Sequence, residues 1–310
     1  MLNFKKLLHK PNLFARVIGI KQENFLKIVE KMQVVWDKTE QERLGNKKRK
    51  RAIGGGRKYA LKSMEEKVLL LLMFYRYNMT HELLGFMFGF DASNVTRLIN
   101  KIALIFEDAI DPKLKDGLIF AHKEAKKISN PIMFFKRYPA FKTIIVDATE
   151  QRRNRPQDKD KRKKVYSGKK KMFANKTQIL IDENNRIVDV SQKYDGAIHD
   201  KKIFNLDNTA SRIPSHSSCL GDLGYLGIPK EYPELNILLP HKKSKCQKEL
   251  TKEQKEFNKQ HAKKRVRIEN VIGRKKKFKV LSDVYRGKEK NYNQIVRNIA
   301  ALVNFNYGLT

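Results

Sequence analysis

Cysteine, acidic side chains and long apolar runs are all scarce in this sequence of 310 residues. Two cysteines, Cys219 and Cys246, are too few for a disulfide framework or a four-cysteine zinc site. The longest apolar run, Val68 to Tyr75, has eight residues and is too short to span a bilayer. The amino terminus is basic, but His9-Lys10-Pro11 interrupts any signal-peptide core. We therefore expect a soluble protein of a reducing compartment that makes no contact with membranes.

Positive charge is abundant. The chain has 67 Lys and Arg against 33 Asp and Glu, which leaves a formal net charge of +34. A charge of this size destabilises a compact fold by self-repulsion unless a polyanion offsets it. Counterion release from phosphates makes nucleic acid the natural polyanion. Because 40% of the residues are hydrophobic and 17 are Phe, a disordered basic tail is excluded. The alternative to nucleic-acid contact is a protein that is merely basic.

The first 130 residues are predicted to be helical in two blocks. Apolar side chains recur at helical spacing over 21–36, within an N-terminal helical region at 1–44. Residues 45–60 contain four glycines, three of them consecutive, and seven basic side chains, so they are predicted to form a flexible linker. This linker could track phosphates or be a solvated tether.

Residues 61–130 are predicted to form a DNA-binding domain of the helix-turn-helix type. A capping box at Ser63 begins a buried helix, Thr80 caps a second, and Ser93 opens a third after a short break. In this plan the last helix enters the major groove. We expect its polar face to contact bases or phosphates through Thr96, Arg97 and Asn100. The alternative is the solvated face of an ordinary three-helix bundle.

From about residue 131 the hydrophobic pattern changes, and 131–310 is predicted to be one α/β domain. Strands are predicted at 143–146, 177–181, 186–191, 219–221 and 236–240. A short helix is expected at 199–205 and a long basic helix at 252–278. This order predicts a mixed sheet covered by helices.

Three acids stand out in this region. Asp147 and Asp222 directly follow buried strands, and Glu269 is the only acid among nine basic residues at 261–279. At about 100° per residue, Arg265 and Lys276 lie within roughly 40° of Glu269 on the helix. A few carboxylates can hold two Mg²⁺ or Mn²⁺ ions about 3.5–4 Å apart for phosphodiester cleavage. Zinc would need His and Cys, and the seven His show no ligand spacing. A simple ion pair on a solvated helix is the alternative.

Taken in order, five motifs resemble those of the DDE superfamily endonucleases, the insertion-sequence transposases. They are Val146–Glu150 with Arg155-Pro156, Tyr166–Lys171, Asp195–Asp200, Gly221–Tyr225 and Arg265–Lys276. The resemblance implies a ribonuclease H-like catalytic core, a mixed five-stranded sheet with helices, preceded by an all-α helix-turn-helix domain. It also implies that Asp147, Asp222 and Glu269 are the catalytic residues and the ligands of two Mg²⁺ or Mn²⁺ ions.

The resemblance further implies what the protein does. A transposase of this kind binds double-stranded DNA at the terminal inverted repeats of its element, cleaves it, and joins the 3′-hydroxyl ends to target DNA. It implies a homodimer in the synaptic complex and a bacterial, cytoplasmic protein associated with the nucleoid. In this family the cations that match Arg265 and Lys276 hold DNA phosphates. Ala262 stands where some relatives have a Tyr. We also expect DNA contacts from the basic residues Arg267, Lys169, Lys170 and Lys171.

Other residues and other functions remain open. Glu150 lies three residues after Asp147, on the opposite face of a strand, so we expect it to support the metal ligands or to pair with Arg152 rather than to bind metal itself. His199 and Asp200 match a family motif but could simply cap the helix that follows. The chain could be a decayed or host-adopted DNA-binding protein without chemistry. It could also be a metal-dependent nuclease that hydrolyses DNA and never transfers strands.

Overall fold

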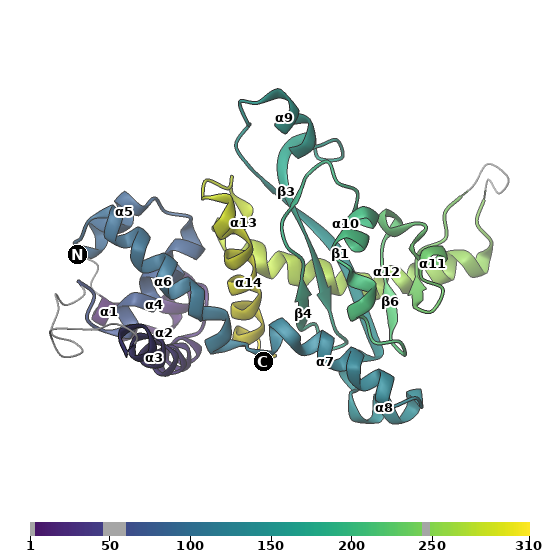
Figure 1. Cartoon of the computed structure of the whole chain (residues 1–310), viewed down its shortest axis with the longest axis horizontal. Coiled ribbons are helices and arrows are strands. Elements are labelled where there is room, and N and C mark those ends of the chain that lie inside the picture. Colours follow the sequence, from purple (N-terminus) through teal and green to yellow (C-terminus); the bar gives the residue numbers. More distant parts are fainter. Residues whose placement is uncertain (1–3, 46–59, 244–248) are drawn as a thin grey trace.

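The computed structural model of the chain describes residues 4–45, 60–243 and 249–310. A block of helices lies beside a mixed β-sheet, and the C-terminal helix lies between them (Figure 1). Nearly all of the predicted linker at 45–60, and Cys246, lie outside the described residues. The helical block comprises α1 (Phe4–Leu8), α2 (Pro11–Ile18), α3 (Gln22–Gly45), α4 (Met64–Tyr77), α5 (His81–Phe88) and α6 (Ala92–Ile110).

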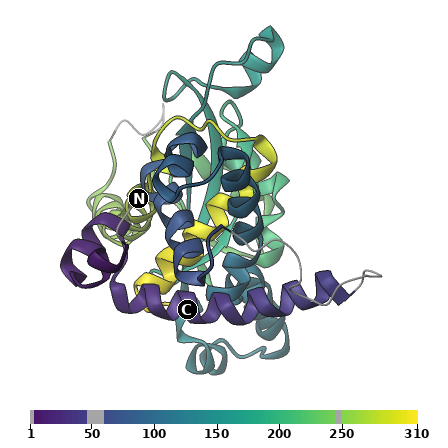
Figure 2. The same cartoon turned by 90° about the vertical axis from the view of Figure 1, so that its left-hand side faces the viewer.

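The helical block forms around α4, as its sequence predicts. The Ser63 hydroxyl accepts the Glu66 amide at 3.2 Å, and Glu66 accepts the Ser63 amide at 3.3 Å, which completes the capping box. Residues 68–73 of this helix are buried on every side. Each buried leucine stabilises the fold by about 1.5–3 kcal/mol. Helix α3 extends to Gly45, well beyond the predicted 21–36, and crosses the base of the block (Figure 2).

Helices α5 and α6 are joined by the tight turn that a helix-turn-helix requires. Thr80 caps α5, and Gly89 ends it with φ 76°, a backbone conformation that favours glycine. A side chain at Gly85 would place its Cβ 2.4 Å from the Phe90 carbonyl oxygen, so this tight turn requires glycine at position 85. The N-cap of α6 is Asp91 rather than Ser93, which falls in the first turn of the helix. That prediction was wrong by two residues because Ala92 already has helical geometry.

The sheet has the predicted mixed topology of five main strands. Its order is β4-β3-β1-β6-β7; β1 pairs antiparallel with β3 and parallel with β6, and β6 pairs parallel with β7. Two further short strands, β2 and β5, pair antiparallel with the first half of β3. The strand bounds are β1 (Thr143–Arg152), β2 (Tyr166–Ser167), β3 (Met172–Ile181), β4 (Ile187–Val190), β5 (Tyr194–Asp195), β6 (Ser218–Leu220) and β7 (Asn236–Leu238). The arrangement is that of a ribonuclease H-like core.

The first two strands are longer than predicted. β1 continues through Arg152 and β3 begins at Met172, so Asp147 lies inside a strand and not at its end. The polar second half of β1 stays in the sheet because its backbone groups pair with β3 as far as Arg152 opposite Ala174. The two strands rise into an arm that carries α9 (Lys159–Val165) at its tip (Figure 1).

Helices cover both faces of the sheet. One face packs against α12 (Lys252–Lys276), α13 (Lys279–Ser282) and α14 (Glu289–Asn306) through one hydrophobic cluster shared with the helical block. The other face packs a second cluster that includes Phe204 and Tyr225. The remaining elements are α7 (Lys113–Lys127), α8 (Pro131–Arg137), η1 (Pro139–Lys142), α10 (Asp200–Leu206), η2 (Thr209–Arg212), η3 (Leu223–Tyr225) and α11 (Ile228–Glu231).

Helix α14 joins the helical block to the sheet. The Asn298 amide donates to the Tyr75 hydroxyl at 2.7 Å and to the Ala103 carbonyl at 2.8 Å. One turn and a half later, Asn304 donates to Asp111 at 2.7 Å and exchanges two hydrogen bonds with the backbone of Ile187 in β4. None of the helices in the described ranges is long and apolar enough to cross a membrane.

Candidate active site

Asp147 and Asp222 lie side by side because of the parallel pairing of β1 with β6. The register places Ile145 opposite Leu220, and each acid follows its own member of that pair by two residues. Side chains two residues apart along a strand point to the same face. The two carboxylates therefore come level on neighbouring chains, where the sheet gives way to the loop after β6.

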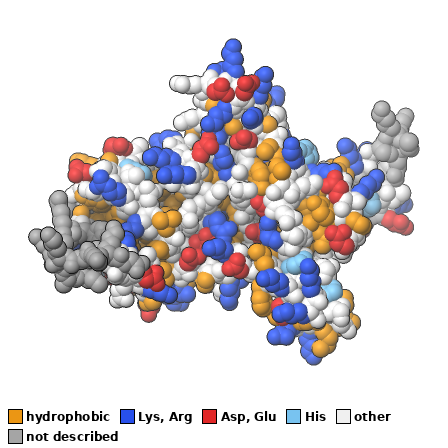
Figure 3. Space-filling view, viewed as in Figure 1, with side chains coloured by type: hydrophobic (Ala, Val, Ile, Leu, Met, Phe, Trp, Pro, Cys, Tyr) orange, Lys and Arg blue, Asp and Glu red, His pale blue; other side chains and the backbone are white. Residues whose placement is uncertain are grey.

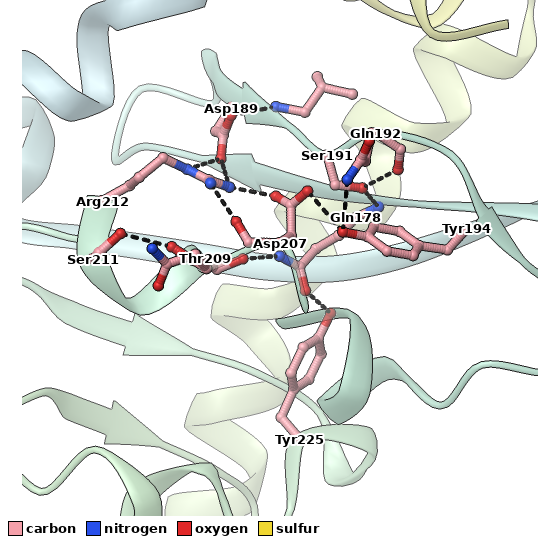
Figure 4. A network of polar contacts seen from close by, with 12 residues as sticks. Gln178, Asp189, Ser191, Gln192, Tyr194, Asp207, Thr209, Ser211, Arg212 and Tyr225 are labelled. Atoms are coloured by element: carbon pink, nitrogen blue, oxygen red, sulfur yellow. Dashed lines mark hydrogen bonds and ion pairs between the residues drawn. The ribbon is translucent and has the colours of Figure 1, made fainter. Parts of the chain in front are cut away.

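Hydrogen bonds hold the loop that carries Asp222 in place. Asp222 Oδ1 accepts the Gly224 amide at 2.8 Å, which closes the 3₁₀ turn η3. The next residue, Tyr225, is buried and donates its hydroxyl to Gln178 Oε1 at 3.3 Å. Gln178 in turn donates to Thr209 at 2.7 Å (Figure 4). The neighbouring polar network contains Arg212, which pairs with Asp189 at 2.7 Å and with Asp207 at 2.5 Å. The Tyr225–Gln178 contact ties the loop of Asp222 to β3.

A third carboxylate, Asp200, approaches Asp222 from α10. A Cβ built on Gly224 would lie 2.7 Å from Asp200 Oδ2 and 2.8 Å from Asp222 Oδ1, so both acids flank this glycine. The sequence motif had marked Asp200, but left it as a possible cap of α10. The structure instead pairs its side chain with Lys176 Nζ at 3.1 Å.

Lys176 was missed by the sequence analysis, which began the second strand at 177, although β3 begins five residues earlier, at Met172. Its ammonium group contacts Asp200, Glu150 at 3.4 Å and the Ile198 carbonyl at 2.9 Å, and its side chain is only 8% exposed. For Glu150 the sequence left open a supporting role beside the ligands or an ion pair with Arg152. The pairing with Arg152 was wrong, since Lys176 lies directly opposite Glu150 in the β1–β3 ladder and pairs with it. Lys176 stands in a polar stretch, Asn175 to Gln178, that precedes the apolar end of β3, so the apolar pattern gave no signal for it.

Arg265 of α12 connects the helix to the first acid. Its Nη2 lies 3.4 Å from Asp147 Oδ2. Burial raises the pKa of Asp147 to about 6, the guanidinium of Arg265 lowers it, and the carboxylates of Asp222 and Asp200 raise it. The Nε of Arg265 is buried and has no hydrogen-bond partner among the described residues. One donor of this guanidinium is therefore left for a further acceptor.

Glu269 lies one turn further along the same face of α12 as Arg265 and is exposed. Lys276, also on that face, is close enough to Lys170 for the two cations to interact. Burial and the ammonium of Lys170 lower the pKa of Lys276, whereas Glu150 and Asp147 oppose this shift. The turn that carries Lys169, Lys170 and Lys171 is exposed. Basic residues from α12 and from the β2–β3 turn therefore meet beside Asp147.

Comparison with known families agrees with this geometry. The family described as "DDE superfamily endonuclease" matches residues 146–304, which contain all three acids. The family described as "Helix-turn-helix of DDE superfamily endonuclease" matches residues 59–110, which contain α5 and α6. The chain belongs to the DDE superfamily endonucleases. The resemblance drawn from the motifs, and the helix-turn-helix prediction, are confirmed.

Two curated proteins are similar over most of this DDE endonuclease. A probable transposase for insertion sequence element IS702 from Microchaete diplosiphon is 27% identical over 297 residues, 96% of this chain and 95% of the relative. A putative transposase for insertion sequence element IS112 from Streptomyces albus G is 25% identical over 233 residues, 75% of this chain and 76% of the relative. No solved structure matches the chain significantly.

Membership of the DDE endonucleases implies the use of a divalent metal ion. Within the described part of the chain, no three His, Cys, Asp or Glu side chains converge closely enough to hold a metal ion. The acids Asp147, Asp222 and Asp200 at this edge of the sheet nevertheless fit Mg²⁺ or Mn²⁺, because all their donor atoms are carboxylate oxygens. Asp147, Asp222 and Asp200 repel one another, and the Arg265 guanidinium, 3.4 Å from Asp147, offsets part of this repulsion. The remaining repulsion favours binding of a further cation. Glu269 as the third ligand stays a prediction.

The DNA contacts predicted for this endonuclease differ in what their side chains do. Arg267 turns away from the acids and bonds Asn185 at 2.7 Å and the Glu183 carbonyl. The Thr96 hydroxyl donates to the Ala92 carbonyl at 2.9 Å and lies 2.7 Å from His81 Nδ1. Arg97 is exposed and donates to Asn94. The roles of these residues toward DNA stay predictions.

Proposed function

We propose that this DDE endonuclease is a DNA transposase of an insertion sequence. It binds the terminal inverted repeats of its element, cleaves the DNA, and joins the 3′-hydroxyl ends to target DNA. The observation that carries the proposal is the level placement of Asp147 in β1 and of Asp222 just after β6, with α12 and its Arg265 packed over Asp147. The net charge of +34 and the helix-turn-helix supply the affinity for DNA.

Asp147, Asp222 and Glu269 are the residues that would hold Mg²⁺ or Mn²⁺. When bound, two such ions stabilise the attacking and leaving oxygens of phosphodiester cleavage. The protein's own contribution is placement. The sheet register fixes Asp147, and the Gly224 amide together with the Tyr225–Gln178 contact fixes Asp222. Lys176 holds Asp200 and Glu150 beside them.

Positive side chains around the acids hold the DNA. Arg265 has a buried Nε without a partner in the described residues, a donor suited to a phosphate oxygen beside Asp147. Lys276 and the exposed Lys169, Lys170 and Lys171 extend this positive surface toward the arm. Strand transfer by such an enzyme brings two element ends together, so we propose that a homodimer acts on them.

The proposal is tested with a plasmid that carries the gene and its natural flanks. Asp147→Asn should abolish cleavage at the element ends in Mg²⁺ or Mn²⁺, with DNA affinity unchanged, because only the carboxylate charge is removed. Asp116→Asn, an exposed acid of α7, is the matched control and should cut normally. Undiminished cutting by Asp147→Asn would reject the assignment.

The same assay separates the alternative functions. Joining of 3′-hydroxyl ends to a target plasmid identifies a transposase, whereas hydrolysis alone identifies a nuclease. A wild-type chain that binds the ends but never cuts them would be a DNA-binding protein without chemistry.

A further inference from the structure

A large groove lies between the helix-turn-helix and the segment that joins α13 to α14. Its volume is about 840 Å³, and it is lined by α4, α5 and α6 on one side and by residues 280–295 on the other. Figure 1 shows the connection before α14 facing α5 and α6. The floor is apolar and includes Phe74 and Leu104, the latter 66% exposed. No sequence pattern indicated this groove.

The rim of the groove is positively charged. Arg286, Lys288 and Lys290 line it from the C-terminal side, and all three are exposed. Lys288 and Lys290 form no ion pair with an acid in the described part of the chain. Across the groove, Glu82 is the acid that lines it. The rim therefore carries an excess of positive charge that the protein itself does not neutralise.

The acid between the two lysines is turned away from the groove. Glu289 pairs with Arg153 of the arm and with Lys193 at 3.1 Å. Hydrogen bonds from Arg153 and Lys193 lower the pKa of Glu289 to about 2, so it stays ionised and bound to these cations. Lys288 is also the N-cap residue of the 18-residue helix α14, whose first amide groups add partial positive charge here. An anion is the occupant that matches this rim.

The groove also contains residues of the predicted DNA-reading helix. Thr96 and Asn100 of α6 line it together with Lys288 and Lys290. The Asn291 amide donates to Asn100 Oδ1 at 3.1 Å, so the start of α14 touches the exposed face of α6. Duplex DNA that places its major groove over α6 would therefore bring one sugar-phosphate strand against the start of α14.

We propose that this groove is a binding site for one phosphate backbone of duplex DNA, in which Lys288 and Lys290 neutralise phosphates beside α6. The inference rests on the proposed function, because it assumes that α6 faces DNA. It adds a second wall, contributed by the C-terminal part of the chain, to the helix-turn-helix surface. Contacts of this kind set the register of the protein on the duplex without reading sequence.

The test uses a fluorescent duplex of about 30 base pairs, selected by the wild-type chain from a random-sequence pool. Lys288→Ala/Lys290→Ala should weaken binding at least about tenfold at 0.1 M salt. It should also reduce the slope of log affinity against log salt by about 2, since each lost phosphate contact accounts for about 0.9. Lys113→Ala/Lys115→Ala is the matched control, with the same charge and spacing on exposed sites of α7. Lys288→Arg/Lys290→Arg should bind like wild type.

Each result decides one question. If Lys288→Ala/Lys290→Ala binds DNA as tightly as the control Lys113→Ala/Lys115→Ala, the groove proposal fails, even when the wild-type chain binds and cuts element ends. If wild type neither binds nor cuts them, the proposed function fails first. Where the alanine pair does not fold, Lys290→Gln alone should still lower the salt slope by about 1, and an unchanged slope would overturn the proposal. Normal DNA binding by an alanine pair that no longer self-associates would assign the groove to a second copy of the chain instead.

Discussion

Charged side chains are arranged differently at the acidic edge of the sheet, formed by Asp147, Asp200 and Asp222, and in the groove beside α6. At the edge two of the three acids face a cation of the same chain, Asp147 with Arg265 and Asp200 with Lys176. At the groove Lys288 and Lys290 have no such acid within the described ranges, and Glu289 is bound elsewhere. Ion pairs within the chain fix the positions of acidic side chains on which DNA cleavage depends. Cations left unpaired are available to a polyanion. Figure 3 shows Lys and Arg side chains spread over this face of the molecule.

Removing the cation at the edge should have the largest effect. Lys176→Met leaves Asp200 and Glu150 without their shared partner, at 13% and 8% exposure. Breaking such a buried pair costs about 3–5 kcal/mol of unfolding free energy. Lys164→Met, at an exposed site of α9, should cost almost nothing. Chemical denaturation measures both variants.

The Lys176 result can be separated from a general packing defect. Adding Asp200→Asn to Lys176→Met should restore part of the lost stability, because one uncompensated charge is removed. Cleavage should stay low in the double variant. A loss below about 0.5 kcal/mol for Lys176→Met would mean that the edge is not held by internal pairing.

The next effect comes from the glycine between two acids. Gly224→Ala would place a methyl group within 2.8 Å of both Asp200 and Asp222, so their carboxylates must separate. We expect cleavage to fall about 10²-fold, the usual cost of displacing a reacting group by about 1 Å. DNA affinity should not change. Gly273→Ala on α12 has nothing within 4 Å of the added carbon. It should cut normally and raise the free energy of unfolding slightly, because Ala favours a helix more than Gly does. Equal cleavage by the two variants would contradict the close approach of these acids.

Lys275 should give the smallest effect, on stability alone. It is fully buried, its Nζ has no partner among the described residues, and burial lowers its pKa to about 7. The unfolded chain therefore binds more protons than the folded one between about pH 7 and pH 10, so stability rises with pH across this window.

Lys275→Met should remove this pH dependence and stabilise the protein by about 2 kcal/mol at pH 7. The advantage over wild type should shrink as the pH rises. Lys277→Met, at an exposed neighbouring position, should change neither property. Thermal unfolding between pH 7 and pH 10 makes the comparison, and a constant difference between Lys275→Met and wild type would refute it.

Local patterns predicted much of this fold. The buried runs before Asp147 and Asp222 formed strands, the capping box at Ser63 began α4, and α12 spans Lys252–Lys276, close to its predicted range. The second half of β1 was missed because its side chains are polar and only pairing with β3 keeps it in the sheet. Lys176 was missed with it.

The groove beside α6 could not be predicted from local pattern at all. Asn100 and Asn291 are 191 residues apart in the chain, and neither stands in a motif that refers to the other. Their contact depends on α14 being buried between the helical block and the sheet, through Asn298 and Asn304. Such a surface arises from tertiary packing and not from sequence periodicity.

The proposed function requires that Asp147, Asp222 and Glu269 serve one metal site. Its most direct test is a Mn²⁺ titration of the full chain, with free Mn²⁺ followed by electron paramagnetic resonance. Asp147→Asn and Glu269→Gln are compared with wild type and with Asp116→Asn. We expect each of the first two variants to weaken Mn²⁺ binding at least about tenfold, while Asp116→Asn binds like wild type. If Glu269→Gln binds Mn²⁺ like wild type while Asp147→Asn does not, Glu269 is not part of the site, and the claim is contradicted.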